Sequence, residues 1–310
     1  SALAVFEEIR GIDANYKDVN DLYITAKYEP MYRDANQYLE TGLYRKAYYT
    51  YESIINGAGS YKQSVALKDE AQEKGTITVL INDLSYTSYR YGETTSEITS
   101  DLKGKLSSLN NPFLRIIDPS SLGVNLYENG KMNMQAANLA GIKAVLTGTV
   151  TDIRMYNGKL DKDEKRGYLK HVTKTKDKEG KEIEKVSYTK TKYYEYDQTN
   201  RSSLSLNFKL VSTEDNSVLV SDQINHNKSD RIHYATYEGD KNKLIPGYWK
   251  YSNRESSEDV KKDNKSDINH LQDLLKADKN IKSAQTLLTE LINQSVNEIT
   301  QKVDKYNPEK

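Results

Sequence analysis

Two short patterns in the sequence have residue types and spacing that could do chemistry. Ser100 and Lys103 have the spacing at which a lysine activates a serine nucleophile in some hydrolases, but the companion motifs of those enzymes are missing. We therefore interpret the pair as a chance match on a helix. Asp161 and Asp163 are spaced like the first ligands of a calcium loop. In that pattern Gly167 falls one place late, and no glutamate closes the loop.

The other reactive side chains form no recognisable centre. The chain has four histidines and no cysteine, which excludes disulfides, thiol nucleophiles and thiolate metal sites. Only His226 and His233 are close in sequence, and their spacing matches no common zinc motif. There is no P-loop, no GxSxG and no GxGxxG. The sequence thus predicts a protein that is not an enzyme and uses no cofactor or metal.

The composition narrows the class of partner. Lys+Arg and Asp+Glu balance at 45 each, which removes the overall basic excess of a nucleic-acid-binding protein. No apolar run reaches the ~20 residues of a membrane helix. Tyrosine is abundant, with 25 residues against 3 Phe and 1 Trp. Because a tyrosine joins an apolar ring to a polar tip, this abundance has two interpretations: a bias of composition, or a tyrosine-rich binding surface.

The elements that would position a site begin with a helical region at residues 1–75. Within it, Ala35, Gly42, Ala47 and Ile54 follow a spacing that resembles a tetratricopeptide-type helix pair. One such unit cannot form a solenoid, which needs at least three repeats. A packing appendage and a peptide-binding groove are both open interpretations of this region.

From residue 76 to 310 the sequence predicts a second domain. Apolar or β-branched runs at 77–81, 113–117 and 144–153 predict strands, with helices at 94–109 and 131–140 between them. An antiparallel pair follows, in which the first strand alternates through Leu204, Leu206, Phe208 and Leu210.

A helical stripe of apolar residues from 271 to 303 predicts a long C-terminal helix, interrupted near 278–280, that either packs on the sheet or forms a coiled coil. The predicted fold class is therefore α+β. It consists of a mixed sheet flanked by helices, with an N-terminal helical hairpin region and a long C-terminal helix.

A charged insertion at about 155–200 interrupts the sheet. With Lys178-Glu179-Gly180 as a three-residue loop and Gly180 left-handed, the facing pairs are Asp177–Lys181, Lys176–Glu182, Lys174–Glu184 and Val172–Val186. A shift by one residue would set Lys174 against Lys185, and like charges directly opposite each other destabilise a ribbon. We therefore predict a long hairpin that is polar on both sides. Each lysine near the middle of a bilayer would cost ~2–4 kcal/mol, so the hairpin is expected to stay in water.

A second insertion, at about 225–267, is polar but carries several aromatic residues. They either contact a partner or glycan, or dock the loop onto its own domain. The candidate partner-binding residues of the two insertions are Val172, Lys174, Lys176, Lys185, Tyr188, Tyr193, Tyr194, Tyr234, Tyr237, Tyr248, Trp249 and Tyr251.

The order of these elements resembles the CsgG-like family. The resemblance rests on the segments Lys143–Ile153 and Leu204–Val220, and it covers roughly residues 76–305. This fold is that of the curli secretion channel and of related outer-membrane lipoproteins, including activators of cell-wall synthases. The insertions at 167–197 and 225–267 lie where the curli channel has its membrane hairpins, but here they are rich in lysine.

The resemblance implies a non-enzymatic periplasmic scaffold or accessory protein of a bacterial secretion or assembly complex. It would be anchored at the outer membrane through a lipid upstream of Ser1, and its partners would be other envelope proteins, bound through the hairpin and the Tyr/Trp-rich loop. Strand addition to the hairpin edge is one such binding mode. Two alternatives stay open: an oligomeric ring or channel component that binds further copies of itself, and a module that contacts peptidoglycan or activates a synthase.

Overall fold

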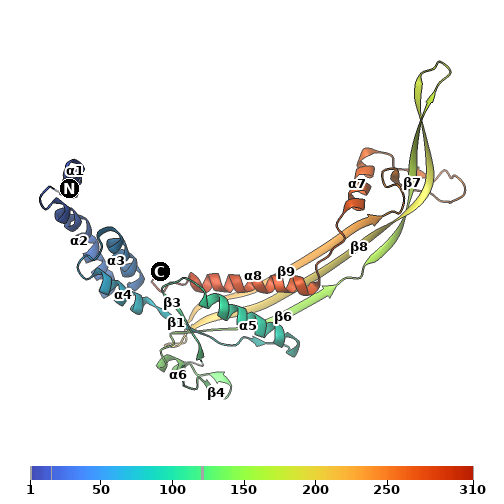
Figure 1. Ribbon diagram of the computed structural model, residues 1–310. Helices are drawn as coiled ribbons and strands as arrows, with labels where there is room; N and C mark the ends of the chain where they lie inside the picture. The colour runs from blue at the N-terminus through green and yellow to red at the C-terminus, as the bar shows by residue number, and fades with distance from the viewer. Residues whose placement is uncertain (1, 15, 120–121, 310) are drawn as a thin grey trace. The chain divides into compact units, whose positions relative to one another are not determined.

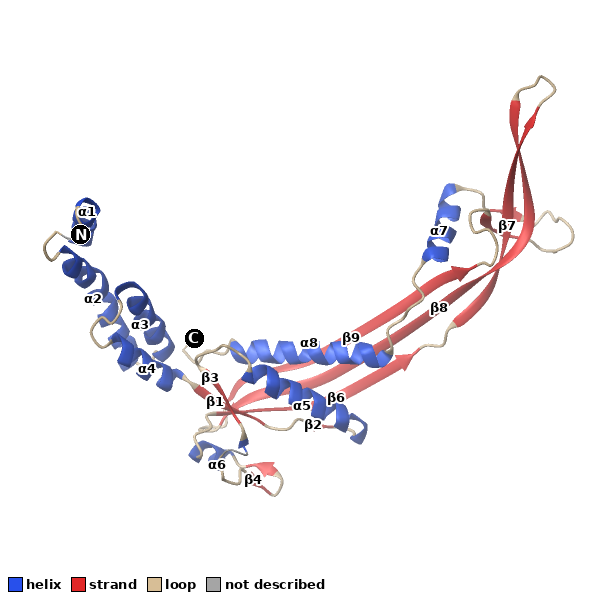
Figure 2. Ribbon diagram, viewed as in Figure 1, coloured by secondary structure: helices blue, strands red, loops and turns tan. Residues whose placement is uncertain are grey.

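The computed structural model describes residues 2–14, 16–119 and 122–309, and its helices and mixed sheet confirm the α+β class (Figures 1 and 2). The chain divides into two compact units. Unit 1 comprises Ser1–Thr151, Leu206–Ile224 and Gln294–Lys310, and unit 2 comprises Asp152–Ser205 and Asn225–Asn293. None of the described helices combines the length and the low polarity needed to cross a bilayer.

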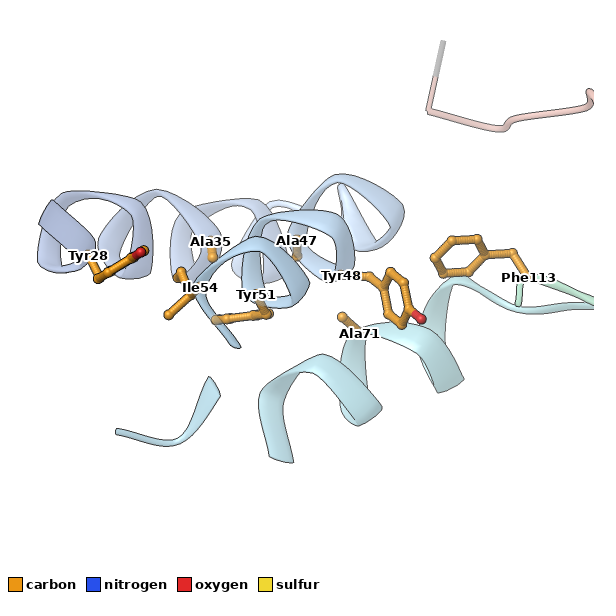
Figure 3. Packing of buried hydrophobic residues seen from close by; sticks show 8 residues of the cluster. All are labelled: Tyr28, Ala35, Ala47, Tyr48, Tyr51, Ile54, Ala71 and Phe113. Atoms are coloured by element: carbon orange, nitrogen blue, oxygen red, sulfur yellow. The ribbon is translucent and has the colours of Figure 1, made fainter. Parts of the chain in front are cut away.

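The N-terminal part of unit 1 is helical, as predicted. It contains α1 (Ala2–Ile12), α2 (Val19–Glu40), α3 (Tyr44–Ala58) and α4 (Ser64–Gly75). Its core combines alanines, aromatic residues and one isoleucine. Figure 3 shows these side chains from close by: Tyr28, Ala35, Ala47, Tyr48, Tyr51, Ile54, Ala71 and Phe113. The alanines are fully buried and let the helices approach, while the tyrosine rings fill the space between them.

Strands β1 (Ile77–Ile81), β3 (Leu114–Ile117) and β6 (Ala144–Asn157) form a parallel part of the sheet in unit 1. Strand β1 lies between β3 and β6, with Ile77 opposite Leu114 and Val79 opposite Ala144. Crossover helices such as α5 (Gly92–Ser107) are the connections that parallel strands require. These strands lie where the sequence predicted them.

Two predicted boundaries in unit 1 were wrong. The helix expected at 131–140 is the shorter α6 (Met134–Leu139), because Lys131–Met132 form β5 and pair with β4 (Tyr127–Glu128). The Asn133 side chain accepts a hydrogen bond from the Ala136 amide at 3.0 Å and caps the helix there. The helix expected from residue 94 begins at Gly92.

Strands β8 (Glu182–Ser212) and β9 (Val218–Thr236) make up the antiparallel pair. They meet at a turn at residues 213–217, where the Ser217 carbonyl accepts from the Ser212 amide at 2.9 Å. On β6, a Cβ at Gly148 would lie 2.5 Å from the Asn207 carbonyl oxygen, so this close approach requires glycine.

The C-terminal helical stretch divides where the sequence indicated. Helices α7 (Lys265–Lys276) and α8 (Ala284–Asp304) are separated by a turn in which the Asp278 carboxylate accepts from the Asn280 amide at 3.0 Å. The apolar stripe of α8 is buried within this chain, which favours the packing interpretation over the coiled coil: Leu287, Leu288, Leu291, Ile292, Val296, Ile299 and Val303.

Unit 2 is built on the hairpin insertion. Strand β7 (Asp161–Lys176) pairs with β8 on one side and with β10 (Leu244–Tyr248) on the other, and β11 (Val260–Lys261) pairs with β10. Helix α7 packs Leu271, Leu274 and Leu275 against Tyr193 and Leu244. Unit 2 therefore has its own small core at the base of the hairpin.

Candidate functional site

The distal part of the β7–β8 hairpin, from His171 to Ser187, is here called the hairpin arm. Its register confirms the prediction from the charges, with Val172 opposite Val186, Lys174 opposite Glu184 and Lys176 opposite Glu182. Lys174 and Lys176 thus each face a glutamate directly, which stabilises the ribbon.

The tip of the arm is a turn that is stabilised by a glycine and by side-chain hydrogen bonds. Gly180 has φ +81°, a left-handed conformation that glycine adopts without strain. The Asp177 carboxylate accepts hydrogen bonds from the amides of Glu179 and Lys181, both at 2.9 Å. The predicted three-residue loop is therefore confirmed.

The outer edge of the arm is open along β7. Strand β10 pairs with β7 only at Gly167–Leu169, and the Lys170 amide still donates to the Lys243 carbonyl at 2.8 Å. In the sheet order of the described residues, β7 has no other outer neighbour. From His171 onward its outer backbone groups therefore face solvent, and β7 and β8 continue past α7 as a two-stranded ribbon (Figure 1).

Three aliphatic side chains on the arm are exposed to solvent. Val172 and Val186 form a facing pair and are 48% and 42% exposed, and Ile183 on the other face is similarly open. The predicted lysines Lys174, Lys176 and Lys185 are exposed around them. Ile183 and Val186 were not among the predicted site residues, although their alternation with charged residues was a readable signal.

The base of the arm is covered by the segment Trp249–Asp263, here called the aromatic loop. Lys170 Nζ lies 2.8 Å from Asp263 Oδ2, and the Tyr188 hydroxyl donates to the same oxygen at 2.6 Å. Lys190 Nζ lies 2.6 Å from Asp259 Oδ2 and donates to the Tyr251 carbonyl at 2.8 Å. Three side chains of the hairpin thus clamp the loop.

Trp249 faces inward, so the interpretation that the loop docks on its own domain holds for this residue. Its side chain is 5% exposed and packs with Tyr168 and Ile245. The indole N–H is shared between the carbonyls of Gly167 and Thr191, at 3.2 and 3.3 Å. A partner or glycan cannot reach this ring while the loop is docked.

Two further predicted contact residues are also corrected, because they are buried. Tyr193 lies in the core under α7, and Tyr234 stacks on Tyr196 with ring centroids 4.8 Å apart. The Tyr237 hydroxyl is partly buried and accepts from the Thr191 hydroxyl at 3.2 Å. The rings of Tyr193 and Tyr234 supply apolar packing, and the hydroxyls of Tyr193 and Tyr237 have polar partners in Glu195 and Thr191.

The remaining predicted aromatic residues lie at the rim of the loop or on the hairpin. Tyr248 and Tyr251 are exposed, and the Arg254 guanidinium lies 4.0 Å from the centroid of the Tyr251 ring. Lys162 Nζ lies over the Tyr194 ring, 4.0 Å from its centroid. The structure therefore leaves the arm side chains, Tyr248 and Tyr251 exposed, and it removes Tyr193, Tyr234 and Trp249 from the candidate surface.

The clamp shifts the pKa of both loop carboxylates. The hydrogen bond from Lys190 lowers the pKa of Asp259 below its ordinary value. Burial raises the pKa of Asp263, but the hydrogen bonds from Lys170 and Tyr188 outweigh it, and the net shift is downward. Both carboxylates therefore hold the loop on the hairpin most strongly in the ionised form.

These shifts predict an acid-dependent release of the loop. A lowered folded-state pKa contributes stability above the ordinary aspartate pKa of about 4, and this contribution is lost as pH falls through the folded value. Trp249 is the one tryptophan of the chain, so its fluorescence reports docking. We expect its emission to shift to longer wavelength below about pH 4.

Asp259→Asn is the matched variant for this titration. It leaves the Lys190 ammonium without its carboxylate, so we expect the longer-wavelength emission already at pH 7 and a smaller acid transition. Native-like emission of this variant at pH 7 would show that the Lys190–Asp259 pair does not hold the loop.

Across residues 2–14, 16–119 and 122–309, no group of three His, Asp or Glu residues is placed to hold a metal ion. Lys103 belongs to α5, and its Nζ lies 2.8 Å from Asp83 Oδ1 in an exposed ion pair.

Comparison with known proteins gives distant likenesses only. No family model and no curated protein matches the chain. Among solved structures, a homologue of neuraminyllactose-binding hemagglutinin from Helicobacter pylori has a TM-score of 0.34 at 11% identity, covering 74% of this chain and 87% of that one. Lipoprotein GNA1162 from Neisseria meningitidis has a TM-score of 0.25 at 12% identity, covering 71% and 99%. The PelC dodecamer from Paraburkholderia phytofirmans has a TM-score of 0.26 at 10% identity, covering 49% and 72%.

Proposed function

We propose that this chain is a non-enzymatic accessory protein of a bacterial envelope assembly, and that its hairpin arm binds an extended segment of a partner protein by strand addition. The observation that carries the binding mode is the end of β10 at the base of the hairpin, which leaves the β7 edge open from His171 onward. The envelope context rests on the resemblance of the sequence to the CsgG-like family.

In the part of the chain that the structure describes, the hairpin arm is an isolated two-stranded ribbon. A two-stranded hairpin is marginally stable in water, and a third strand supplies hydrogen bonds to its free backbone groups. Val172, Val186 and Ile183 would lose exposed apolar surface when alternate side chains of the added strand pack on them. The Lys–Glu pairs keep the arm in one register, so the edge is held ready for a partner.

The test must shorten the arm without releasing the aromatic loop. Deleting Leu169–Lys192 would remove Lys170, Tyr188 and Lys190, and with them the clamp. A sharper variant replaces residues 173–185 by Asn-Gly, so that Val172 and Val186 flank a two-residue turn. Unchanged Trp249 emission would show that the base of the hairpin is intact.

The matched control exchanges one charge pair, Lys174→Glu with Glu184→Lys. It keeps the net charge and the cross-strand complementarity, and it changes no backbone group. Native, shortened and exchanged chains would be crosslinked in envelope extracts, and the bound proteins quantified by mass spectrometry. We expect the shortened arm to lose at least one partner that the exchanged chain retains.

The outcomes separate this proposal from its alternatives. An unchanged set of partners for the shortened arm would refute binding through the arm. Loss of the partner in the exchanged chain as well would indicate recognition of charged side chains rather than of the backbone. If the lost partner is a second copy of this chain, the arm serves the oligomeric ring. A glycan that binds at the aromatic loop would contact Tyr248 and Tyr251 rather than Trp249, since Trp249 is buried.

A further inference from the structure

The N-terminus of α3 lacks a cap of its own. Its N-cap residue is Leu43, which offers no side-chain hydrogen bond, and the first turn carries no acidic residue. The turn instead begins with Tyr44, Arg45 and Lys46. Free amides and the positive end of the helix dipole, reinforced by two basic residues, together attract an anion.

A carboxylate from the far end of the chain lies on this helix end. Glu309 Oε1 accepts from the Arg45 amide at 2.6 Å, and Oε2 accepts from the Lys46 amide at 3.2 Å. The Arg45 guanidinium donates to the Tyr306 carbonyl at 2.7 Å. The tail segment Tyr306–Glu309 is therefore held by a backbone carbonyl and by a carboxylate three residues later.

Arg45 is a buried cation with unused hydrogen-bonding capacity. The residue is 9% exposed, and its Nε has no hydrogen-bond partner among the described residues. Its guanidinium carbon lies 5.0 Å from the centroid of the Phe113 ring, which fixes its position. Burial lowers the pKa of Arg45, and the Glu309 carboxylate opposes that shift. A buried guanidinium N–H with no acceptor is an unfavourable feature that an anionic ligand can relieve.

The same residues line a cavity beside the tail. It has a volume of about 760 Å³, and its walls include the basic residues Arg45, Lys46 and Lys305 together with the acidic residues Asp304 and Glu309. All of these belong to unit 1. Drug-sized ligands occupy pockets of roughly 300–1,000 Å³, so a short peptide segment fits.

We propose that this cavity is a binding site for a glutamate-bearing peptide segment of a partner protein, and that Glu309 occupies it as an internal ligand. A competing carboxylate would take the two α3 amides, and its peptide backbone would take the guanidinium. Because the tail is tethered, it acts at an effective concentration in the millimolar range, so the native chain binds such a peptide weakly until the tail is displaced. This site is independent of the hairpin arm.

The probe for this site is a fluorescein-labelled peptide with the sequence of residues 303–310, VDKYNPEK, with blocked ends. A second peptide carries Gln in place of Glu309. Fluorescence anisotropy would measure both against the full chain and against Glu309→Gln. We expect Glu309→Gln to bind the glutamate peptide about tenfold more tightly than the native chain does, and the glutamine peptide to bind about tenfold more weakly.

Lys46→Glu, made in the Glu309→Gln chain, separates binding from folding. The new carboxylate favours the helix N-terminus but repels the ligand, so it should abolish binding while the helix remains stable. Lys178→Glu, at the exposed arm tip, is the charge-matched control and should bind normally. Equal affinity of native and Glu309→Gln chains, equal affinity of the two peptides, or normal binding by Lys46→Glu would each overturn the proposal.

Discussion

Replacing Trp249 by alanine is expected to lower the free energy of unfolding of unit 2 by about 3–5 kcal/mol. The indole ring fills the space beside Tyr168 and Ile245, and its N–H serves the carbonyls of Gly167 and Thr191. Alanine would leave a cavity and two buried carbonyls without this donor. The Arg166 guanidinium, 4.9 Å from the ring centroid, would lose its contact as well.

Chemical denaturation followed by far-UV circular dichroism measures this effect, because the variant has no tryptophan to report it. Hydrogen exchange of β10 and of the aromatic loop should rise first, since those segments pack on the ring. Trp249→Phe keeps an aromatic ring but has no N–H donor, so we expect a loss of about 1–3 kcal/mol. Native stability of the alanine variant would show that the ring is not packed.

The buried position of Trp249 also bears on the choice of a test for glycan binding. An alanine at this position would reduce binding to cell-wall sacculi by unfolding the loop, whatever the ligand. Tyr251→Ala avoids this difficulty because the ring is exposed.

Replacing Tyr51 by alanine is expected to destabilise the helical region of unit 1 by a similar amount, about 3–5 kcal/mol. Tyr51 is fully buried among α2, α3 and α4, and its hydroxyl donates to Asn36 Oδ1 at 2.5 Å. Its ring meets that of Tyr32 edge to face, with centroids 6.1 Å apart. The variant would lose the apolar packing, the hydrogen bond and this ring contact together.

Two variants divide the Tyr51 effect into its parts. Tyr51→Phe keeps the ring and leaves Asn36 without its donor, so we expect a loss of about 1–2 kcal/mol. Tyr49→Ala, on the exposed side of the same helix, should cost less than about 1 kcal/mol. Thermal unfolding of the three chains would measure the differences, and a Tyr49 effect as large as that of Tyr51 would contradict the assigned core.

The tyrosine content illustrates why composition alone left two interpretations open. Tyr28, Tyr48 and Tyr51 build the helical core, and Tyr168 and Tyr193 build the core of unit 2. The chain therefore uses tyrosine where other proteins use Phe or Leu, with the hydroxyl reaching a polar neighbour. Other tyrosines, such as Tyr248 and Tyr251, are exposed.

The sequence by itself determined the α+β alternation and the register of the hairpin arm. Both depend on interactions between residues that are close in sequence or directly opposite across one turn. Lys174 can face Glu184 in one register only, and a shift by one residue sets like charges against each other. Local rules are sufficient in such a case, because no distant element takes part.

Only the tertiary structure decided which aromatic rings are buried and what caps α3. Trp249 is buried because strands β7 and β8 supply carbonyls for its N–H, and Glu309 reaches the Arg45 amide across 264 positions of sequence. Tyr and Trp are stable both in a core and at a surface, so their own chemistry does not determine their exposure. That depends on which distant segments cover them, and periodicity in one segment carries no information about such contacts.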